Sequence, residues 1–205
     1  MNALETLFIY HRFITSMKKT KVVTVRRGGI TDNMELKELT DKMMQLLEIK
    51  NTEEMSKKLF DIVRKNNISM YEKFDELVEN DLSVDWMQKI FQYYQADRKE
   101  KKQYYTPRAL ADFIGRLAGN PNTIIDLCAG SGALTIQKWN QNHDIEFVLY
   151  EFDENVLPFL LFNMALRNIK CTVYHSDVLQ AEIFHTYKII RGDKYGVYEE
   201  VEKCQ

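Results

Sequence analysis

Apolar positions between residues 34 and 95 recur every three or four residues, a spacing that predicts amphipathic helices. The first helix carries Leu36, Leu39, Met43 and Leu46 on one face. Similar faces follow within Met55–Val63, Tyr71–Val78 and Trp86–Tyr94. No glycine or proline interrupts this stretch, so we expect a bundle of three or four helices with the aromatic side chains in its core.

Two polar residues predict where helices of this bundle begin. Asn51 stands before Thr52-Glu53-Glu54, and Ser83 stands before the fourth helix. Their side chains have the oxygen that caps a helix N-terminus. The charged segment Gln95–Gln103 then ends the helical pattern and is typical of a solvated linker.

After this linker, helices alternate with short apolar strands. A helix is expected over Pro107–Leu117, with Thr106 as its N-cap and Pro107 in its first turn, where a missing N–H costs nothing. Strands over 123–127, 145–150 and 170–175 are separated by helices over 133–140 and 154–168. Such alternation predicts an α/β fold with a parallel sheet. In the tail, apolar segments flank Arg191-Gly192-Asp193 and predict a hairpin.

The composition fits a folded protein without a global basic field. The 205 residues are 45% hydrophobic and 28% charged, with a formal net charge of −2. Contact with nucleic acid would therefore need a local patch or a partner chain. The three cysteines are widely spaced, and no CxxC or HxxxH pattern occurs, which argues against a disulfide frame and a metal site and favours a reducing compartment.

Nothing in the sequence predicts a membrane protein. The longest apolar run, Val156–Leu166, is about half the length that a bilayer requires. The N-terminus lacks the layout of a signal peptide. We therefore expect a cytoplasmic protein.

Residues 1–33 do not follow the pattern of the rest of the chain. They are either a basic arm that lies along phosphate, or upstream sequence or a loose tail before a native start at Met34. The cations of the first interpretation are Lys18, Lys19, Lys21, Arg26 and Arg27.

The segment Asp126-Leu127-Cys128-Ala129-Gly130-Ser131-Gly132 joins a predicted strand to a predicted helix. Ligands of open parallel sheets bind at the carboxyl ends of the strands. Glycines there let the backbone approach a ligand closely, because they have no Cβ. The segment lacks the Gly-Lys-Ser/Thr of a triphosphate-binding loop and the third glycine of the dinucleotide fingerprint.

Two more carboxylates are expected at the same edge. Glu151 ends the second strand and suits a ribose diol, and Asp177 follows the third strand and suits an exocyclic amino group. Each acid alone is equally well explained as a turn or strand-end residue. Together, three acids without a phosphate-binding lysine favour an adenosine ligand that carries positive charge. S-adenosylmethionine, a sulfonium with an α-ammonium group, is such a ligand.

The ordered motifs resemble the N6-adenine DNA methyltransferases, most closely the modification subunits of type I restriction–modification systems. The resemblance covers about Gln103–Leu179, through "QYYTPRALADFIGRLAG", "IIDLCAGSGALT", "LYEFDENVL...FNMALRNI" and "HSDVL". It implies three groups of cofactor-binding residues: Tyr105, Thr106 and Pro107 at the methionine end; Asp126, Ala129, Gly130 and Gly132 around the methionine; and Glu151, Phe152 and Asp177 at the ribose, the adenine ring and the adenine amino group.

The catalytic tetrapeptide of that family, Asp/Asn/Ser-Pro-Pro-aromatic, has no counterpart in the chain. The prolines are Pro107, Pro121 and Pro158, none adjacent to another and none after Asp177. The tetrapeptide matters because an exocyclic amine is a poor nucleophile, so the flipped base must be stacked and its amine hydrogen-bonded. We therefore assign no catalytic residue.

About 26 residues follow Leu179, too few to complete the larger sheet of the family. Three explanations stand side by side. The chain is a fragment or a truncated reading frame, or a second polypeptide completes its catalytic domain, or it is a compact relative that binds S-adenosylmethionine without methylating.

These observations predict three segments: the arm over 1–33, a helical N-terminal domain over 34–98, and an S-adenosylmethionine-binding, methyltransferase-like domain over 99–205. The expected fold class is α/β, a Rossmann-like S-adenosylmethionine-dependent methyltransferase fold with an incomplete parallel sheet, preceded by a small helical bundle.

The leading function is that of a DNA adenine-N6 methyltransferase-like protein in a restriction–modification type system, with DNA and a completing protein chain as partners. One rival interpretation is a non-catalytic relative that regulates or scaffolds a partner. Another is a methyltransferase that acts on RNA, protein or a small molecule.

Overall fold

A computed structural model describes residues 36–94 and 106–201 of the chain. Internal contacts divide the chain into Met1–Asn33 and Met34–Gln205, and the structure described below belongs to the second unit. The arm over residues 1–33, the linker over 95–103 and Tyr105 lie outside the described residues.

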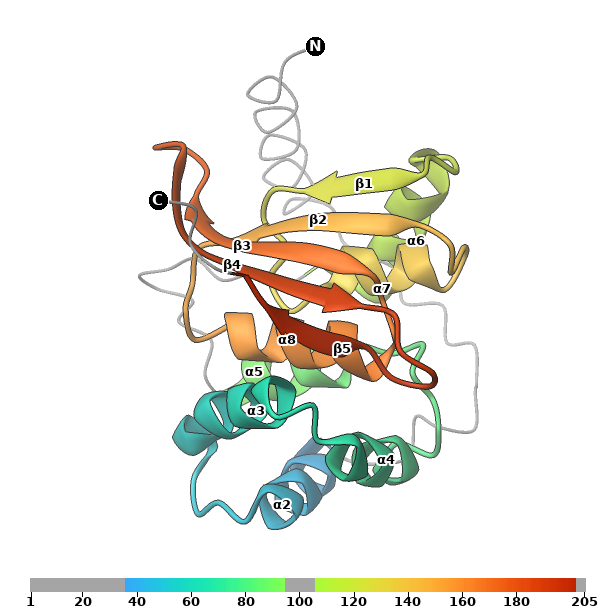
Figure 1. Ribbon diagram of the computed structural model, residues 1–205. Coiled ribbons are helices and arrows are strands. Elements are labelled where there is room, and N and C mark those ends of the chain that lie inside the picture. Colours follow the sequence, from blue (N-terminus) through green and yellow to red (C-terminus); the bar gives the residue numbers. More distant parts are fainter. Residues whose placement is uncertain (1–35, 95–105, 202–205) are drawn as a thin grey trace. The chain divides into compact units, whose positions relative to one another are not determined.

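Four helices form the N-terminal part of the described structure, as the periodicity predicts. They are α2 (Leu36–Leu47), α3 (Met55–Arg64, preceded by the 3-10 turn η1, Thr52–Glu54), α4 (Ile68–Leu77) and α5 (Trp86–Tyr94) (Figure 1). Helices this short are marginal alone, so burial of their apolar faces stabilises them. The buried side chains include Leu39, Met43, Met55, Leu59, Tyr71, Phe74, Met87 and Ile90.

Of the two predicted caps in this bundle, one is right and one is wrong. The side chain of Asn51 accepts a hydrogen bond from the amide of Glu54 at 3.2 Å, as expected. At α5, however, Asp85 rather than Ser83 provides the cap, because its carboxylate accepts from the amide of Gln88 at 2.9 Å. Both residue types can cap, and Asp85 is the one that stands directly before the helix.

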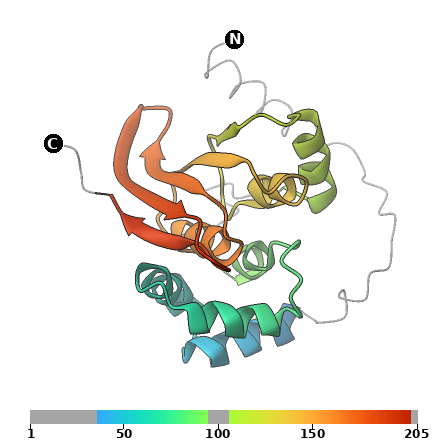
Figure 2. The same ribbon diagram turned by 45° about the vertical axis from the view of Figure 1, so that its right-hand side comes forward.

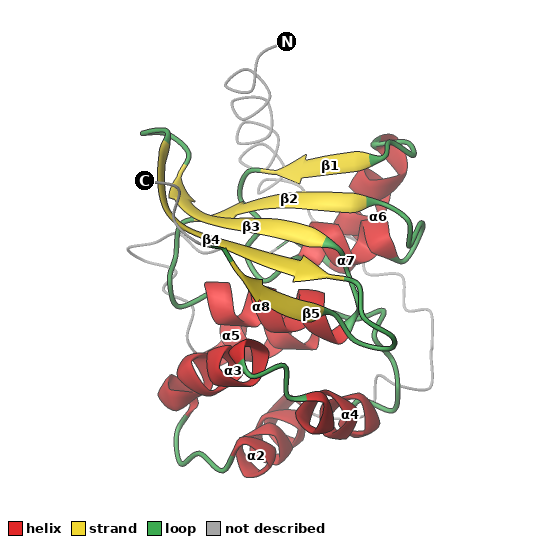
Figure 3. Cartoon of the chain, in the orientation of Figure 1, coloured by secondary structure: helices red, strands yellow, loops and turns green. Residues whose placement is uncertain are grey.

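The rest of the structure is built on a five-stranded sheet in the order β1-β2-β3-β4-β5 (Figure 3). The first three strands are parallel, as the alternation with helices predicts. The last two are antiparallel and form the predicted hairpin. The strands are β1 (Thr123–Asp126), β2 (Glu146–Glu151), β3 (Cys171–Asp177), β4 (Glu182–Ile190) and β5 (Val197–Glu200).

The sheet is therefore mixed, and the antiparallel pairing of β4 with β3 is the part that the sequence did not predict. A parallel connection needs a crossover of about a dozen residues or more. Only a short turn separates Asp177 from Glu182, and another separates Ile190 from Val197. Both connections can therefore form only hairpins.

Three helices accompany the parallel strands: α6 (Arg108–Leu117), α7 (Ala133–Trp139) and α8 (Leu157–Leu166). Because both crossovers have the same hand, α7 and α8 lie on one face of the sheet (Figure 2). All 10 residues of α8 are buried, since this helix contacts β3 and β4 as well as α3 and α5. No helix in the described ranges has the length and apolar character needed to cross a membrane.

Aromatic pairs join α8 to the N-terminal helices. The ring centroids of Phe162 and Phe74 lie 5.3 Å apart, and those of Phe159 and Phe91 lie 5.1 Å apart. Both pairs have the edge-to-face geometry that aromatic rings favour. The helical region and the sheet therefore share one continuous apolar core.

The start of α6 differs from the expectation. Pro107, with φ −59° and ψ 143°, occupies the N-cap in place of Thr106 and offers no side-chain hydrogen bond. Proline suits this place because its φ is fixed and no intrahelical bond needs its missing N–H.

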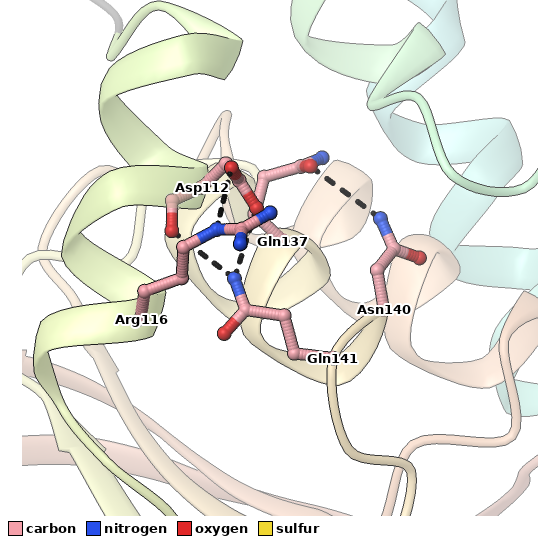
Figure 4. Close-up of polar contacts among 5 residues, drawn as sticks. All are labelled: Asp112, Arg116, Gln137, Asn140 and Gln141. Atoms are coloured by element: carbon pink, nitrogen blue, oxygen red, sulfur yellow. Dashed lines mark hydrogen bonds and ion pairs between the residues drawn. The ribbon is translucent and has the colours of Figure 1, made fainter.

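Polar side chains hold α6 against the end of α7 (Figure 4). The side-chain Nε2 of Gln141 donates to the backbone oxygen of Asp112 at 3.1 Å and to its carboxylate at 3.0 Å. The same carboxylate accepts from Arg116 at 3.0 Å. These bonds fix the helix that leads into β1.

Candidate functional site

The loops after β1, β2 and β3 lie at one edge of the sheet, because these strands are parallel neighbours. We call the three loops, Leu127–Gly132, Phe152–Asn155 and Val178–Ala181, the rim. Two bonds hold the first loop over the end of β2. The amide of Ala129 donates to the carbonyl of Tyr150 at 2.9 Å, and the amide of Gly130 donates to Oε2 of Glu151 at 2.7 Å. The structure thus brings the glycine turn and Glu151 together.

The two glycines of the turn serve different purposes. Gly130 has φ +57°, and a Cβ built there would meet no atom within 4 Å, so its position faces open space. Gly132 has φ +98°, and a Cβ there would lie 2.7 Å from Cε of Met164 and 3.1 Å from Cδ1 of Leu160. Gly132 is therefore favoured by its positive φ and by close packing against the side-chain ends of α8, whereas Gly130 leaves room for a ligand to approach the backbone.

Asp126 ends β1 with one oxygen bonded and the other alone. Its Oδ1 accepts from the amide of Cys128 at 3.1 Å. Its Oδ2 is buried and has no hydrogen-bond partner among the described residues. Burial raises the pKa of this carboxyl, against the opposing effect of the Cys128 amide. A buried carboxylate oxygen without a donor is costly unless a bound group supplies one.

Glu151 is partly buried, and both of its oxygens are bonded. Oε2 accepts from Gly130, and Oε1 accepts from the amide of Asp153 at 2.8 Å. Burial raises its pKa despite these bonds. The next residue, Phe152, is 63% exposed, so one side chain at the end of β2 is polar and held, and the following one offers an accessible ring.

Asp177 ends β3 and stabilises its own turn. Its Oδ1 accepts from the amides of Leu179 at 2.9 Å and Gln180 at 3.1 Å. Next to it, Nε2 of His175 lies 3.1 Å from the carbonyl oxygen of Phe152. The third strand therefore joins the second at the rim, and a turn-stabilising role accounts for one oxygen of Asp177.

The residues before α6 bond to α5. The carbonyl oxygen of Thr106 accepts a hydrogen bond from Nε2 of Gln88, in the first turn of α5, at 3.3 Å. Pro107, the residue that follows, begins α6. The link from this segment to the glycine turn runs through α5.

The carboxylates give the rim a negative field. Cys128, inside the glycine turn, has its pKa raised to about 11 by burial, with Asp126 and Glu151 adding to the rise. A neutral thiol beside two acids is consistent with a site that favours cations. Such a field suits a positively charged ligand.

A buried polar cluster beneath the turn is not evident from the sequence. It consists of Asp85, Ser131, Asn163 and Arg167, all buried. Asp85 accepts from the Ser131 hydroxyl at 2.7 Å and from the Asn163 amide at 2.8 Å. Nη1 of Arg167 donates to Oδ1 of Asn163 at 2.8 Å. The one available signal is the pair Asn163 and Arg167, polar residues at i, i+4 spacing in and just after a helix that is otherwise apolar.

A β-α-β-α-β unit, with a glycine turn after its first strand and acids at the ends of the next two, defines a Rossmann-like fold of the S-adenosylmethionine-dependent methyltransferase type. The model of the N-6 DNA methylase family matches residues 78–193, more than half of the chain. The chain belongs to this family. Neither the search of curated proteins nor the search of solved structures gave a match.

The matched residues begin before α5 and end after β4. They therefore include Asp85 and its segment as well as the whole rim.

Proposed function

We propose that the protein binds S-adenosylmethionine at the rim and acts as a DNA adenine-N6 methyltransferase-like component of a restriction–modification type system. The observation that carries the binding proposal is the buried, unpartnered Oδ2 of Asp126. It lies at the start of a glycine turn whose backbone has open space at Gly130.

Each candidate residue has a role in this proposal. Asp126, Ala129, Gly130 and Gly132 hold the methionine part, with the free oxygen of Asp126 available to its ammonium group. Glu151 accepts from the ribose hydroxyls, because each carboxylate oxygen has a second lone pair beyond its amide bond. The remaining roles fall to Phe152 at the adenine ring, Asp177 at the adenine amino group, and Tyr105, Thr106 and Pro107 at the methionine end.

When bound, S-adenosylmethionine supplies an electrophilic methyl group on a sulfonium sulfur. The residues at the rim fit such a ligand, because two partly buried carboxylates and a Cβ-free backbone position meet at the carboxyl ends of the strands. They bind and orient the cofactor. None of them is proposed to accept a proton from the substrate amine.

Methyl transfer itself is proposed to need the family's tetrapeptide from outside this sequence, as a partner chain would supply it. The Pro-Pro-aromatic tetrapeptide is absent from this sequence, and the net charge of −2 provides no general attraction to DNA. Family membership supports DNA as the substrate. The resemblance to type I modification subunits supports a restriction–modification assembly as the setting.

The free edge of β1 supports this division of labour. Among the described residues, β1 pairs only with β2, and Ile125 on this edge strand is 63% exposed. In open α/β sheets, ligands bind where the strand order reverses direction. A strand added beside β1 would create that reversal at the glycine turn and would carry its own loop to the rim.

The alternative is a non-catalytic relative that binds S-adenosylmethionine and acts through a partner. The absent tetrapeptide favours it. A methyltransferase with an RNA, protein or small-molecule acceptor is a further possibility that the same assay covers.

The test combines calorimetry with a transfer assay. The full chain is titrated with S-adenosylmethionine, S-adenosylhomocysteine and NAD, and we expect the first two to bind and NAD not to bind. Labelled methyl transfer to unmethylated DNA is then measured with the chain alone and with the products of neighbouring genes. Absence of binding would overturn the proposal, whereas binding without transfer under any condition would favour the alternative. Transfer to RNA or protein in place of DNA would identify another substrate.

A further inference from the structure

The carboxylate of Asp85 is enclosed and fully engaged. Asp85 is 6% exposed and stands before α5, where its Oδ1 accepts from the Gln88 amide at 2.9 Å and from the Asn163 side chain at 2.8 Å. Its Oδ2 accepts from the Ser131 hydroxyl at 2.7 Å. Three donors from three separate parts of the chain thus converge on one side chain.

Ser131 connects the Asp85 carboxylate to the glycine turn. It stands between Gly130 and Gly132 and is 1% exposed. Besides the hydroxyl bond to Asp85, its carbonyl oxygen accepts from Asn163 at 2.8 Å. Glycines lose more conformational freedom on ordering than any other residue, so a turn with two of them depends on an anchor between them.

Arg167 lies near Asp85, and its positive charge favours the ionised form of that carboxyl. The guanidinium donates to the carbonyl oxygens of Leu82 and Val84 at 2.8 and 2.7 Å, and to the Asn163 side chain at 2.8 Å. Arg167 therefore fixes the backbone that carries Asp85 and, through Asn163, the second contact of the turn. A buried charge with such support is held in one geometry.

The same segment holds α6 and α7. The carbonyl oxygen of Ser83 accepts from Gln137 at 2.9 Å and from Asn140 at 3.0 Å. The Ser83 hydroxyl accepts from Arg108 at 3.1 Å. Residues 82–88 thus bond to the start of α6, the glycine turn, α7 and α8, and we call them the anchor segment.

We infer that Asp85 is a positioning residue for the cofactor site: through Ser131 it fixes the glycine turn, and the anchor segment sets that turn against the start of α6. The inference rests on the proposed binding of S-adenosylmethionine at the rim. It adds that a residue of the N-terminal helical region, without touching the cofactor, determines how well the cofactor binds.

The test is a double-mutant cycle on cofactor affinity. Asp85→Ala, Ser131→Ala and the double variant are titrated with S-adenosylmethionine by calorimetry at a temperature at which each is folded. Each single change should raise Kd about tenfold or more, as expected for loss of a hydrogen bond to a charged group. The double change should raise Kd no further than Asp85→Ala alone does, because the Ser131 hydroxyl contributes through its bond to Asp85. Asp85→Asn, which still has a bonding group facing Ser131, should recover part of the loss.

Asp75→Ala is the matched control. Asp75 is also buried, at 4% exposure, but its carboxylate bonds to Tyr195 and pairs with Lys194. This variant should lose stability and keep its Kd. If Asp75→Ala raised Kd as much as Asp85→Ala, or if folded Ser131→Ala bound as tightly as wild type, the inference would be wrong. Should Asp85→Ala fail to fold, Ser131→Ala decides alone.

A second measurement does not require the cofactor. Amide hydrogen exchange at Gly130, which donates to Glu151, should become faster in Ser131→Ala and stay unchanged in Asp75→Ala. If wild type bound no S-adenosylmethionine, the proposed function would fail, and exchange would still decide whether Asp85 and Ser131 order the turn. Unchanged exchange in Ser131→Ala would overturn the inference by itself.

Discussion

The backbone amide of Gly130 donates a 2.7 Å hydrogen bond to the carboxylate of Glu151, 21 residues away. The turn after β1 is thereby attached to the end of β2. The bond uses one lone pair of the accepting oxygen and leaves a second available. Glu151 can therefore hold the turn and accept from a ligand hydroxyl at the same time.

Replacing Glu151 by alanine should weaken S-adenosylmethionine binding. The change removes an acceptor of charge-assisted bonds, each worth up to about 1.5–3 kcal/mol, so we expect at least a tenfold rise in Kd. Calorimetry measures it. Glu146→Gln, in the same strand, is the control, because the side chain of Glu146 is partly exposed and pairs with Lys170 at the surface. Equal affinities of wild type and Glu151→Ala would show that the ribose assignment is wrong.

Asp126→Asn should stabilise the ligand-free protein at neutral pH. Burial raises the native pKa of Asp126, so the native state holds the proton more tightly than the unfolded state does. The free energy of unfolding therefore falls as the pH rises from the unfolded pKa, about 4, through the raised native pKa. Asparagine does not ionise, so the variant should gain on the order of 1 kcal/mol at pH 7, and the gain should disappear at or below about pH 4.

Urea unfolding at pH 4 and pH 7 measures this difference. Asp144→Asn serves as the control, since the side chain of Asp144 is 91% exposed and its removal should change stability by less than about 0.5 kcal/mol. The Asp126→Asn variant should also bind S-adenosylmethionine more weakly, because the negative partner of the ammonium group is lost. Lower stability than wild type at pH 7 would contradict the account of Asp126.

Gly132→Ala should destabilise the protein more than Gly119→Ala does. Both glycines have positive φ, but a Cβ at Gly132 would meet Met164 at 2.7 Å, whereas one at Gly119 would meet no atom within 4 Å. Backbone strain of about 1–2 kcal/mol applies to both, and displacement of the flexible ends of Met164 and Leu160 adds about 1 kcal/mol at Gly132 alone, the low end of the cost of overpacking. Urea unfolding of both variants tests this order, and similar losses would refute the packing argument.

Cys128 should react slowly with iodoacetamide although the residue is exposed, because its thiol is partly enclosed by the turn. Burial, reinforced by Asp126 and Glu151, raises its pKa to about 11, so at pH 8 its thiolate fraction is on the order of 100-fold below that of a free cysteine. Mass spectrometry of the Cys128 peptide, in a Cys204→Ser background, gives the rate. The rate should rise between pH 7 and pH 9 and should be higher in Asp126→Asn. Fast alkylation that does not depend on pH would disprove the raised pKa.

A chain that starts at Met34 should unfold with the same midpoint as the full chain. Internal contacts divide the chain at that place, and far more of them lie within the second unit than within the first. Thermal unfolding followed by circular dichroism compares the two chains. A lower midpoint for the shortened chain would show that residues 1–33 stabilise the fold.

Local sequence patterns were sufficient for the parallel half of the sheet. Short apolar strands that alternate with helices predict a parallel sheet, and the glycine turn between Asp126 and Ala133 predicts where a ligand would approach. The hairpin around Gly192 could be predicted for the same reason, since the signal lies within a few residues. The antiparallel pairing of β4 with β3 depends on the short connection after Asp177. The length of that connection is known only once the bounds of both strands are known.

The polar cluster could not be predicted, because its members are distant in sequence. Asp85 bonds to Ser131 across 46 residues and to Asn163 across 78, and periodicity carries no information at such separations. The N-cap of α5 failed for a different reason. Ser83 and Asp85 both have capping side chains, and Asp85 caps the helix because it stands directly before Trp86, a boundary that the apolar pattern did not fix.

The position of α8 limits how such chains can be recombined. The helix packs against β3 and β4, which follow it in the sequence, and against α3 and α5, which precede it. A chimera that joined residues 34–98 of one relative to residues 99–205 of another would bring together two surfaces that had never adapted to each other. The two stretches are therefore expected to be inherited together. An exchange between relatives is expected to succeed only where α8, the helices it contacts and the strands it contacts all come from the same relative.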